Sequence, residues 1–220
     1  MPLVDITRKY VPQEHFIINI QPLREWINAY VAEHGAGRIS IYLEVLNTGS
    51  NVSVNKELQL FPASLMKIPI AMVTLRKVQD GDIKLDDVVS LKQQHLNSDS
   101  GPLYKRGAGA RLTIRELLEA LLLESDNTAY YALLEMASPE ELNGIIEEVG
   151  LVGLFDNSTG AISAKEYSRF FRALYSSSFL DPEHSQFILE MLTRSAFKEF
   201  LSGGLPGEVL FAHKYGEHID

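Results

Sequence analysis

The chain has no cysteine, no apolar run long enough to span a bilayer and no cluster of basic residues. The lack of cysteine excludes disulfides and cysteine-based catalysis, but it does not fix the compartment. The first residues, Met-Pro-Leu-Val-Asp, lack the charged and apolar regions of a signal peptide. We therefore expect either a cytoplasmic protein or a chain that starts after a removed leader. A net charge of −9 argues against nucleic acids and anionic membrane surfaces as main partners.

Metal and cofactor sites are not expected either. The six histidines are scattered along the chain. His213 and His218 stand five positions apart and have no third ligand near them in the sequence. The sequence also has no glycine-rich phosphate-binding motif. Hydrophobic residues make up 45% of the 220 residues, which is enough for one large domain or two small subdomains with a buried core.

The predicted elements are two strands, then many helices, then one late strand. Apolar residues at helical spacing predict a first helix over 22–35. Alternation predicts a hairpin of strands over 39–45 and 52–60, and a last strand over 209–215. Residues 82–110 are interpreted as loop-rich, and helices follow Ser64 and the capping signals Thr113–Glu116, Ser138–Pro139, Ser163–Glu166, Asp181–Pro182 and Ser195. This order indicates an α+β protein with a helical region inserted into a sheet domain.

The sequence Ser-x-x-Lys occurs three times, and in each case an ordinary explanation competes with a chemical one. Ser53 and Lys56 lie in a predicted strand, where positions three apart face opposite ways. Ser195 begins a predicted short helix and is interpreted as an N-cap. Ser64 and Lys67 begin a strongly apolar helix, where they share one face. A lysine among apolar residues can lose its proton and activate a serine; the alternative is again an N-cap serine.

Two later segments carry residues suited to the same cleft. Ser125-Asp126-Asn127 lies at a break between two predicted helices, where the serine can relay a proton and the asparagine can hold a substrate amide. A plain connection between helices would use the same residue types. Lys214 lies in the predicted last strand and is followed by Tyr215 and Gly216; the lysine can set the charge of a cleft, and the glycine permits close approach to a ligand. The alternative is an edge-strand lysine that prevents pairing.

Taken in order, the three motifs resemble those of the penicillin-recognising serine hydrolases, which include class A β-lactamases and related D-alanyl-D-alanine peptidases. The stretches Ser100–Arg106 and Leu205–Lys214 are similar to those that precede the second and third motifs in that family, and the resemblance covers roughly residues 21–218. It implies a β-lactamase-like fold, with an antiparallel sheet flanked by helices and an inserted all-α subdomain. The expected parts are an N-terminal arm or linker (1–20), a sheet subdomain (21–63 and 202–220) and a helical subdomain (64–201).

The resemblance also implies a role for each motif residue. Ser64 would be the nucleophile that forms an acyl-enzyme, and Lys67 would take its proton. Ser125 would pass a proton to the leaving nitrogen. Lys214 would hold Ser125 poised and attract the substrate carboxylate. Asn127 would bind the amide of the acyl side chain.

The third motif supplies the remaining binding residues and the first departure from the family. The backbone N–H groups of Ser64 and Glu217 would form an oxyanion hole, an effect typically worth ~2.7–4 kcal/mol per donor. Gly216 would let the backbone pass close to the ligand. Tyr215 stands where the family usually has threonine or serine, so the small hydroxyl that contacts the substrate carboxylate is absent or displaced. The resemblance therefore does not fix the substrate class.

Two more departures concern the loop over 151–160 and the end of the chain. The family's loop glutamate, which activates the deacylating water, has no counterpart there. Glu166 is interpreted as a capping-box partner, and Asp156 has no geometric argument in its favour. The chain ends at Asp220, where the family continues with two central strands and a C-terminal helix. We therefore expect a fragment of a longer protein, or a partner copy that supplies strands.

These observations predict a serine hydrolase that forms an acyl-enzyme with β-lactams or with D-alanyl-D-alanine-type peptides of peptidoglycan and deacylates slowly. One alternative is a true class A-type β-lactamase with a different water activator. Another is a non-catalytic relative that binds the cell wall. The resemblance places the chemistry outside the cytoplasm, in the periplasm, secreted or at the cell surface. No cofactor, metal or nucleic acid is expected as a partner.

Overall fold

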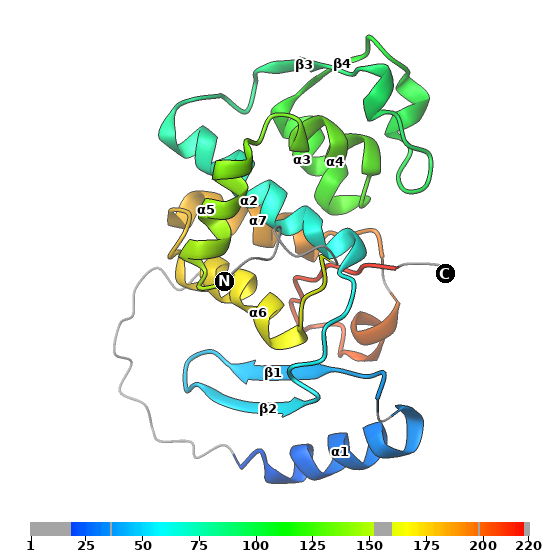
Figure 1. The fold of residues 1–220 in the computed structure, drawn as a ribbon, viewed down its shortest axis with the longest axis vertical. Helices are drawn as coiled ribbons and strands as arrows, with labels where there is room; N and C mark the ends of the chain where they lie inside the picture. Colours follow the sequence, from blue (N-terminus) through cyan, green and yellow to red (C-terminus); the bar gives the residue numbers. More distant parts are fainter. Residues whose placement is uncertain (1–18, 36, 152–159, 198, 218–220) are drawn as a thin grey trace.

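The computed structural model describes residues 19–35, 37–151, 160–197 and 199–217. Two groups of elements stand out in it. A hairpin with one helix against it lies at one end, and a larger set of helices lies above it (Figure 1). Apart from its last two residues, the predicted arm over 1–20 falls outside the described part. The predicted division into a sheet subdomain and a helical subdomain stays a prediction.

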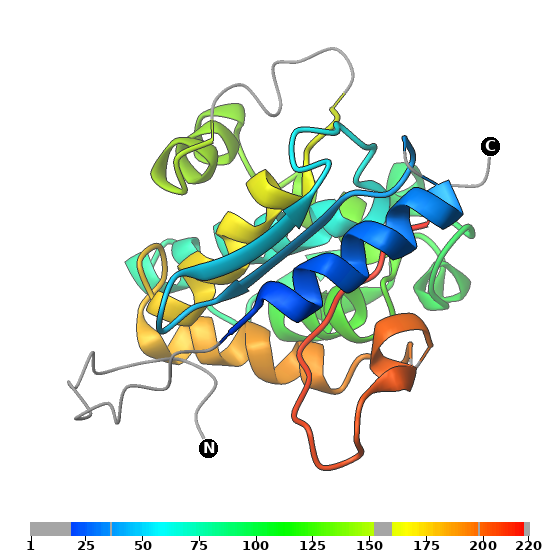
Figure 2. The same cartoon turned by 90° about the horizontal axis from the view of Figure 1, so that it is seen from below.

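The hairpin consists of β1 (Ile41–Val45) and β2 (Ser50–Val54), which pair antiparallel, with Ile41 opposite Val54. Helix α1 (Gln21–Gly35) runs along it (Figure 2). Ile27 and Val31 of α1 form a small core with Val52 of β2. The predicted first helix and hairpin are therefore confirmed. Trp26 and Tyr30 stack on each other on the outer face of α1, where Trp26 is 63% exposed.

Helix α2 (Lys67–Asp80) is the centre of the larger core. Its first nine residues, from Lys67 to Leu75, are all buried. A short 3-10 turn, η1 (Ala63–Met66), precedes it. Helix α2 contacts four of the helices around it; the surrounding helices are α3 (Ile114–Leu123), α4 (Asn127–Leu134), α5 (Pro139–Glu148), α6 (Ala164–Ser176) and α7 (Pro182–Thr193). The core thus fixes the residues at the start of α2.

The predicted capping signals start these helices as expected. In each capping box, the first side chain accepts a hydrogen bond from the backbone of the last residue, which bonds back; the boxes are Thr113–Glu116 on α3, Ser138–Glu141 on α5 and Ser163–Glu166 on α6. Asp181 caps α7, and Pro182 occupies its first turn. Such caps satisfy N–H groups that have no partner inside the helix.

Two local predictions were wrong, namely the length of the second strand and the N-cap at Ser195. The second strand ends at Val54, and Leu60 makes only an isolated bridge with Ile162. Residues 82–110 are loop-rich as predicted, and they also contain β3 (Val88–Ser90), which pairs with β4 (Arg111–Thr113), and the short turns η2 (Gln93–His95) and η3 (Leu103–Arg106). Ser195 is buried and caps no helix, since α7 has already ended and a 3-10 turn, η4 (Phe200–Gly204), follows.

The predicted strand over 209–215 was also wrong. Residues 209–215 form no strand ladder. A strand needs a hydrogen-bonded neighbour, and in the described part of the chain β1 pairs only with β2. The segment is instead held beside the end of α7, where the His213 N–H donates to the Leu192 carbonyl at 3.4 Å. None of the described helices has the length and apolar character needed to cross a bilayer.

Candidate active site

Ser64 and Lys67 meet at the junction of η1 and α2. Lys67 Nζ donates to Ser64 Oγ at 2.8 Å. The turn that presents the serine is strained, because Ala63 just before it has φ +46°, in the left-handed region that disfavours side chains. Strain of this kind persists only where the surrounding structure enforces it, and it is common at functional sites.

Lys67 is 1% exposed, and the residues after helix α3 surround its amine. Besides Ser64, Nζ contacts the Ser125 carbonyl (2.5 Å), Ser125 Oγ (3.1 Å) and Asn127 Oδ1 (2.7 Å). An ammonium has three N–H groups, and here four oxygens surround it. When Lys67 is neutral, its lone pair can accept the proton of Ser64 instead.

The turn that carries Ser125 and Asn127 is built around the buried carboxylate of Asp126. Asp126 Oδ1 accepts from the Ala129 N–H at 2.9 Å and so caps α4, while Oδ2 accepts from the Leu103 N–H at 2.8 Å. Ser125 has φ +56°. The turn therefore leaves the helical path, which allows residues 125 and 127 to face the same amine. This explains how the two side chains of a Ser-x-Asn pair can contact one lysine.

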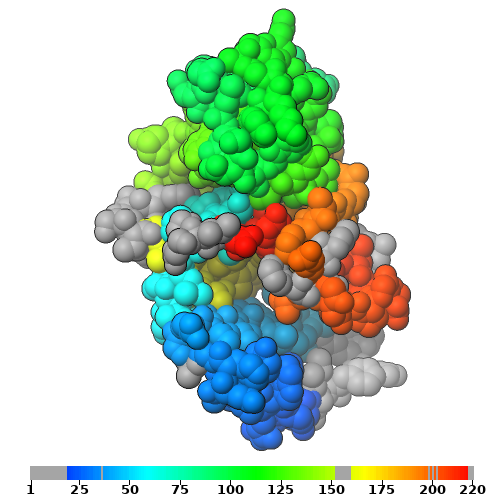
Figure 3. Space-filling model, turned by 90° about the vertical axis from the view of Figure 1, so that its right-hand side faces the viewer, coloured from blue at the N-terminus to red at the C-terminus, as the bar shows by residue number. Residues whose placement is uncertain are grey.

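Lys214 completes the group from the end of the described chain. Its Nζ donates to Ser125 Oγ at 2.8 Å and to the Tyr215 carbonyl at 2.7 Å. Ser125 Oγ therefore lies between the amines of Lys67 and Lys214. The space-filling view shows this last segment (red) directly below the green helical part (Figure 3).

Burial lowers the pKa of both lysines. The pKa of Lys67 falls to about 8 because its amine is desolvated, although the negative charge of Asp126 opposes this. The pKa of Lys214 falls to about 7 through burial and, in addition, the positive charge of Lys67. Both amines therefore titrate close to neutral pH, so that a fraction of the molecules carries Lys67 neutral, as a proton acceptor, beside a charged Lys214.

The backbone of Gly216 passes close to the serine turn. A Cβ at this position would lie 2.6 Å from the Pro62 carbonyl oxygen and 3.1 Å from Ser64 N, so glycine is required for close approach. Glu217 follows on the exposed side. Tyr215 stacks on Phe197, with ring centroids 3.9 Å apart, and its ring forms one side of the Lys214 environment. The predicted residues of all three motifs therefore lie together.

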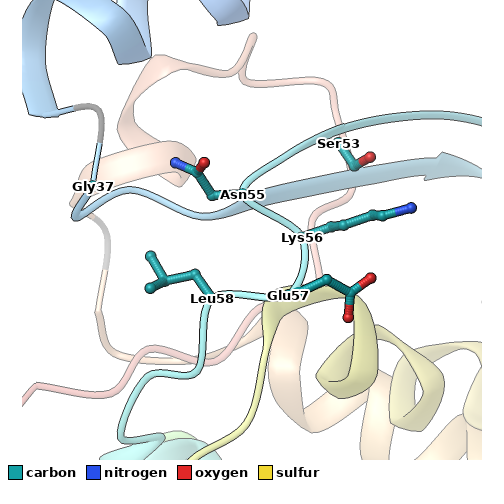
Figure 4. Close-up of a pocket in the computed structure, with 6 residues that line it drawn as sticks. All are labelled: Gly37, Ser53, Asn55, Lys56, Glu57 and Leu58. Carbon is teal, nitrogen blue, oxygen red and sulfur yellow. The ribbon is translucent and has the colours of Figure 1, made fainter.

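The competing residues are placed elsewhere. Ser53 lies in β2 opposite Tyr42, and Lys56 follows the strand, both at an open pocket beside the hairpin (Figure 4). Glu166 completes the capping box with Ser163 and also accepts a hydrogen bond from Gln59, at 2.9 Å. This confirms its interpretation as a cap. Asp156 lies outside the described residues.

Sequence reasoning missed two residues that hold the site in place. Ser100 Oγ donates to the Ser125 carbonyl at 2.8 Å. Asn97 Oδ1 accepts from Asn127 Nδ2 at 3.0 Å. Both come from the loop before η3, where Asn, Ser, Gly and Pro indicate a chain break but not its partner. In the described part of the chain, no three histidine or acidic side chains gather as a metal site would require.

Residues 22–220 match the sequence family described as the beta-lactamase enzyme family. The chain belongs to the β-lactamase enzyme family. Among curated proteins, it is 30% identical over 121 residues to the D-alanyl-D-alanine carboxypeptidase DacF of Bacillus subtilis (strain 168). It is 27% identical over 113 residues to the β-lactamase regulatory protein BlaB of Streptomyces cacaoi. These alignments cover 52% and 50% of this chain but only 31% and 36% of the two relatives.

Solved structures of this family share the fold. PBP-A superposes with a TM-score of 0.80 at 21% identity, covering 90% of this chain and 78% of that one. A mutant of PBP-A, solved as an acyl-enzyme complex with penicillin-G, gives 0.81 at 21% identity, with 89% and 77% covered. A β-lactamase from Sphaerobacter thermophilus gives 0.76 at 22% identity, with 87% and 76% covered. The expected β-lactamase-like fold is confirmed.

Proposed function

We propose that the protein is a serine hydrolase that forms an acyl-enzyme on Ser64 with β-lactams or D-alanyl-D-alanine-type peptides, and that it deacylates slowly. The observation that carries the proposal is the 2.8 Å contact between Lys67 Nζ and Ser64 Oγ, made by an amine whose pKa is lowered to about 8. Support also comes from family membership and from the PBP-A mutant captured as an acyl-enzyme with penicillin-G. The cell-wall substrate implies an extracytoplasmic location.

Acylation follows from the contacts of the site. Neutral Lys67 takes the proton of Ser64 Oγ as this oxygen attacks the carbonyl carbon of the substrate amide. The backbone N–H groups of Ser64 and Glu217 are the proposed donors to the resulting oxyanion. When the carbon–nitrogen bond breaks, Ser125 gives its proton to the leaving nitrogen. Ser125 regains a proton from the lysines that flank its Oγ, at 2.8 and 3.1 Å.

Slow deacylation is proposed because the sequence offers no counterpart to the family's water-activating loop glutamate. Hydrolysis of the ester on Ser64 needs a base to take a proton from water. Glu166 is already used in capping α6, and the loop sequence over 151–160 contains no glutamate. We therefore expect the acyl-enzyme to break down more slowly than it forms.

The hairpin supports a further element of the proposal, namely that more strands complete the sheet. In the described part, β1 pairs with β2 alone, and Leu43 of β1 is exposed. A free strand edge is a pairing surface. We propose that a segment beyond these 220 residues or a second copy of the chain covers it. Light scattering on this chain and on a longer natural product separates the two cases. Pairing with a second copy makes this chain a dimer, whereas coverage by a further segment leaves the longer product monomeric.

Intact-mass spectrometry after mixing with penicillin G tests the acyl-enzyme, with Ser64→Ala as control. We expect an adduct of the mass of the intact penicillin that persists for many minutes and is absent from the control. An adduct that forms and clears, with continued loss of penicillin, would instead identify a true β-lactamase. The lack of any adduct, also with a D-alanyl-D-alanine depsipeptide, would leave a non-catalytic binding relative and overturn the proposal.

A further inference from the structure

The site depends on the orientation of the Asn127 side-chain amide. Its oxygen accepts from Lys67 Nζ at 2.7 Å, and its nitrogen donates to Asn97 Oδ1 at 3.0 Å. If the amide turned over, a donor would face the amine of Lys67, which is itself a donor when charged. Lys67 therefore keeps this acceptor only if the Asn127 amide is held in the observed orientation.

Asp99 fixes the orientation of the Asn97 side-chain amide, because the two groups of Asp99 that contact it cannot exchange donor and acceptor roles. The backbone N–H of Asp99 donates to Asn97 Oδ1 at 2.9 Å, and Asn97 Nδ2 donates to the carboxylate Oδ2 of Asp99 at 3.1 Å. A backbone N–H is only a donor, and an ionised carboxylate is only an acceptor. Asn97 must therefore present its oxygen, and Asn127 must meet it with its nitrogen.

We propose that Asn97 is a positioning residue for the reaction, which fixes the amide of Asn127 so that its oxygen faces Lys67 and one N–H remains for the substrate. The inference deepens the proposed function and rests on it for the substrate contact. Asn127 Nδ2 carries two hydrogens, of which Asn97 uses one. The second is available to a carbonyl oxygen on the acyl side of the substrate.

The loop that carries Asn97 is anchored on both sides of this contact. Its backbone N–H and carbonyl both bond the Thr128 hydroxyl of α4, at 3.1 and 3.2 Å. The Asn127 N–H donates to the Ser100 carbonyl at 2.9 Å. Just before the loop, the buried ring of His95 contacts Glu135 at the end of α4, at 2.5 Å. The position of Asn97 is thus set by its backbone, and its side chain, oriented by Asp99, contacts Asn127.

A set of substitutions separates orientation from folding. Asn97→Leu keeps the shape of the side chain but removes the acceptor. Asn97→Asp keeps an acceptor for Asn127. Asn143→Ala on α5 is the matched control for loss of an asparagine away from the site. Each is made in the natural chain and in an Asn127→Ala background, and thermal unfolding identifies any variant that fails to fold.

Two readouts are measured for each variant: the rate of penicillin G acylation by mass spectrometry, and the titration of Lys67 by NMR of labelled lysine. We expect Asn97→Leu to slow acylation about tenfold. This is the typical effect of losing one hydrogen bond, here the bond that orients Asn127 toward the charged Lys67. We also expect it to lower the pKa of Lys67, because an acceptor for the ammonium is lost. Asp126 and Lys214, the charged groups that face Lys67, are the same in all variants. Asn97→Asp places a carboxylate beside that of Asp99 but still offers Asn127 an acceptor, so it should slow acylation less than Asn97→Leu and should not lower that pKa.

The double variants give the decisive comparison. In the Asn127→Ala background, Asn97→Leu should change neither readout, because the residue acts through Asn127. An equal loss in both backgrounds, or an unchanged Lys67 titration in Asn97→Leu, would overturn the inference. If the natural chain forms no adduct, the proposed function fails, while the NMR titration still decides whether Asn97 orients Asn127.

Discussion

The two lowered lysine pKa values predict a bell-shaped pH dependence for acylation. Lys67 must be neutral to take the Ser64 proton, and its pKa is about 8. Lys214 must be charged to attract an anionic substrate, and its pKa is about 7. Below pH 7 the neutral fraction of Lys67 falls about tenfold per pH unit, and above pH 8 the charged fraction of Lys214 falls in the same way. The second-order acylation rate should therefore peak between the two values.

Stopped-flow acylation with a chromogenic cephalosporin between pH 5.5 and 9.5 measures this profile for the free enzyme. Because the two amines share Ser125 Oγ, the two limbs belong to the pair, and a variant is needed to assign them. Lys214→Arg keeps its charge over the whole range. It should therefore lose the falling limb and keep the rising one, whatever its absolute rate. A flat natural profile, or a falling limb that survives unchanged in Lys214→Arg, would refute the reasoning.

Two further predictions concern residues around the site. Gly101→Ala should lower the unfolding temperature and reduce acylation, because its Cβ would lie 2.1 Å from Asp126 Oδ2 at a backbone φ of +79°. Circular dichroism measures the unfolding temperature and the adduct assay measures acylation, and a stable variant with full acylation would contradict this prediction. Glu166→Ala should cost about 0.5–2 kcal/mol of unfolding free energy through the lost capping box, while the deacylation rate stays the same; a slower deacylation, with folding intact in urea titrations, would assign Glu166 to catalysis instead.

Local signals in the sequence predicted most of the helical frame. The capping boxes at Thr113, Ser138 and Ser163 start helices where expected, because a cap is decided by residues within one turn. The apolar run after Lys67 also predicted the central helix correctly. Errors arose where a partner distant in the sequence decides the structure. Alternation over 209–215 predicted a strand, but alternation alone supplies no hydrogen-bonding neighbour.

The site was only partly accessible from the sequence for the same reason. Motif order identified Ser64, Ser125 and Lys214 as candidates, and they lie together. The sequence could not show that Ser125 takes a left-handed backbone conformation, φ +56°, which brings its hydroxyl between two amines. It also could not show that Asn97 contacts Asn127, because Asn-rich breaks are typical of any loop. Spacing identifies residues that belong to local motifs, but it does not identify those that orient them.

The position of strain and burial favours catalysis over a module that only binds. Holding Lys67 at a pKa of about 8 instead of 10.5 disfavours its charged form by about 3 kcal/mol, at 1.36 kcal/mol per unit. Since the unfolded chain binds more protons over this range, the cost is fully present below pH 8 and is relieved as pH rises toward 10.5. Left-handed Ala63 and Ser125 add strain at the same place. A module that only held a carboxylate would be better served by exposed, fully charged lysines on a relaxed backbone. These costs are useful if one amine must give up its proton beside a serine, which is the chemistry that acylation of Ser64 requires.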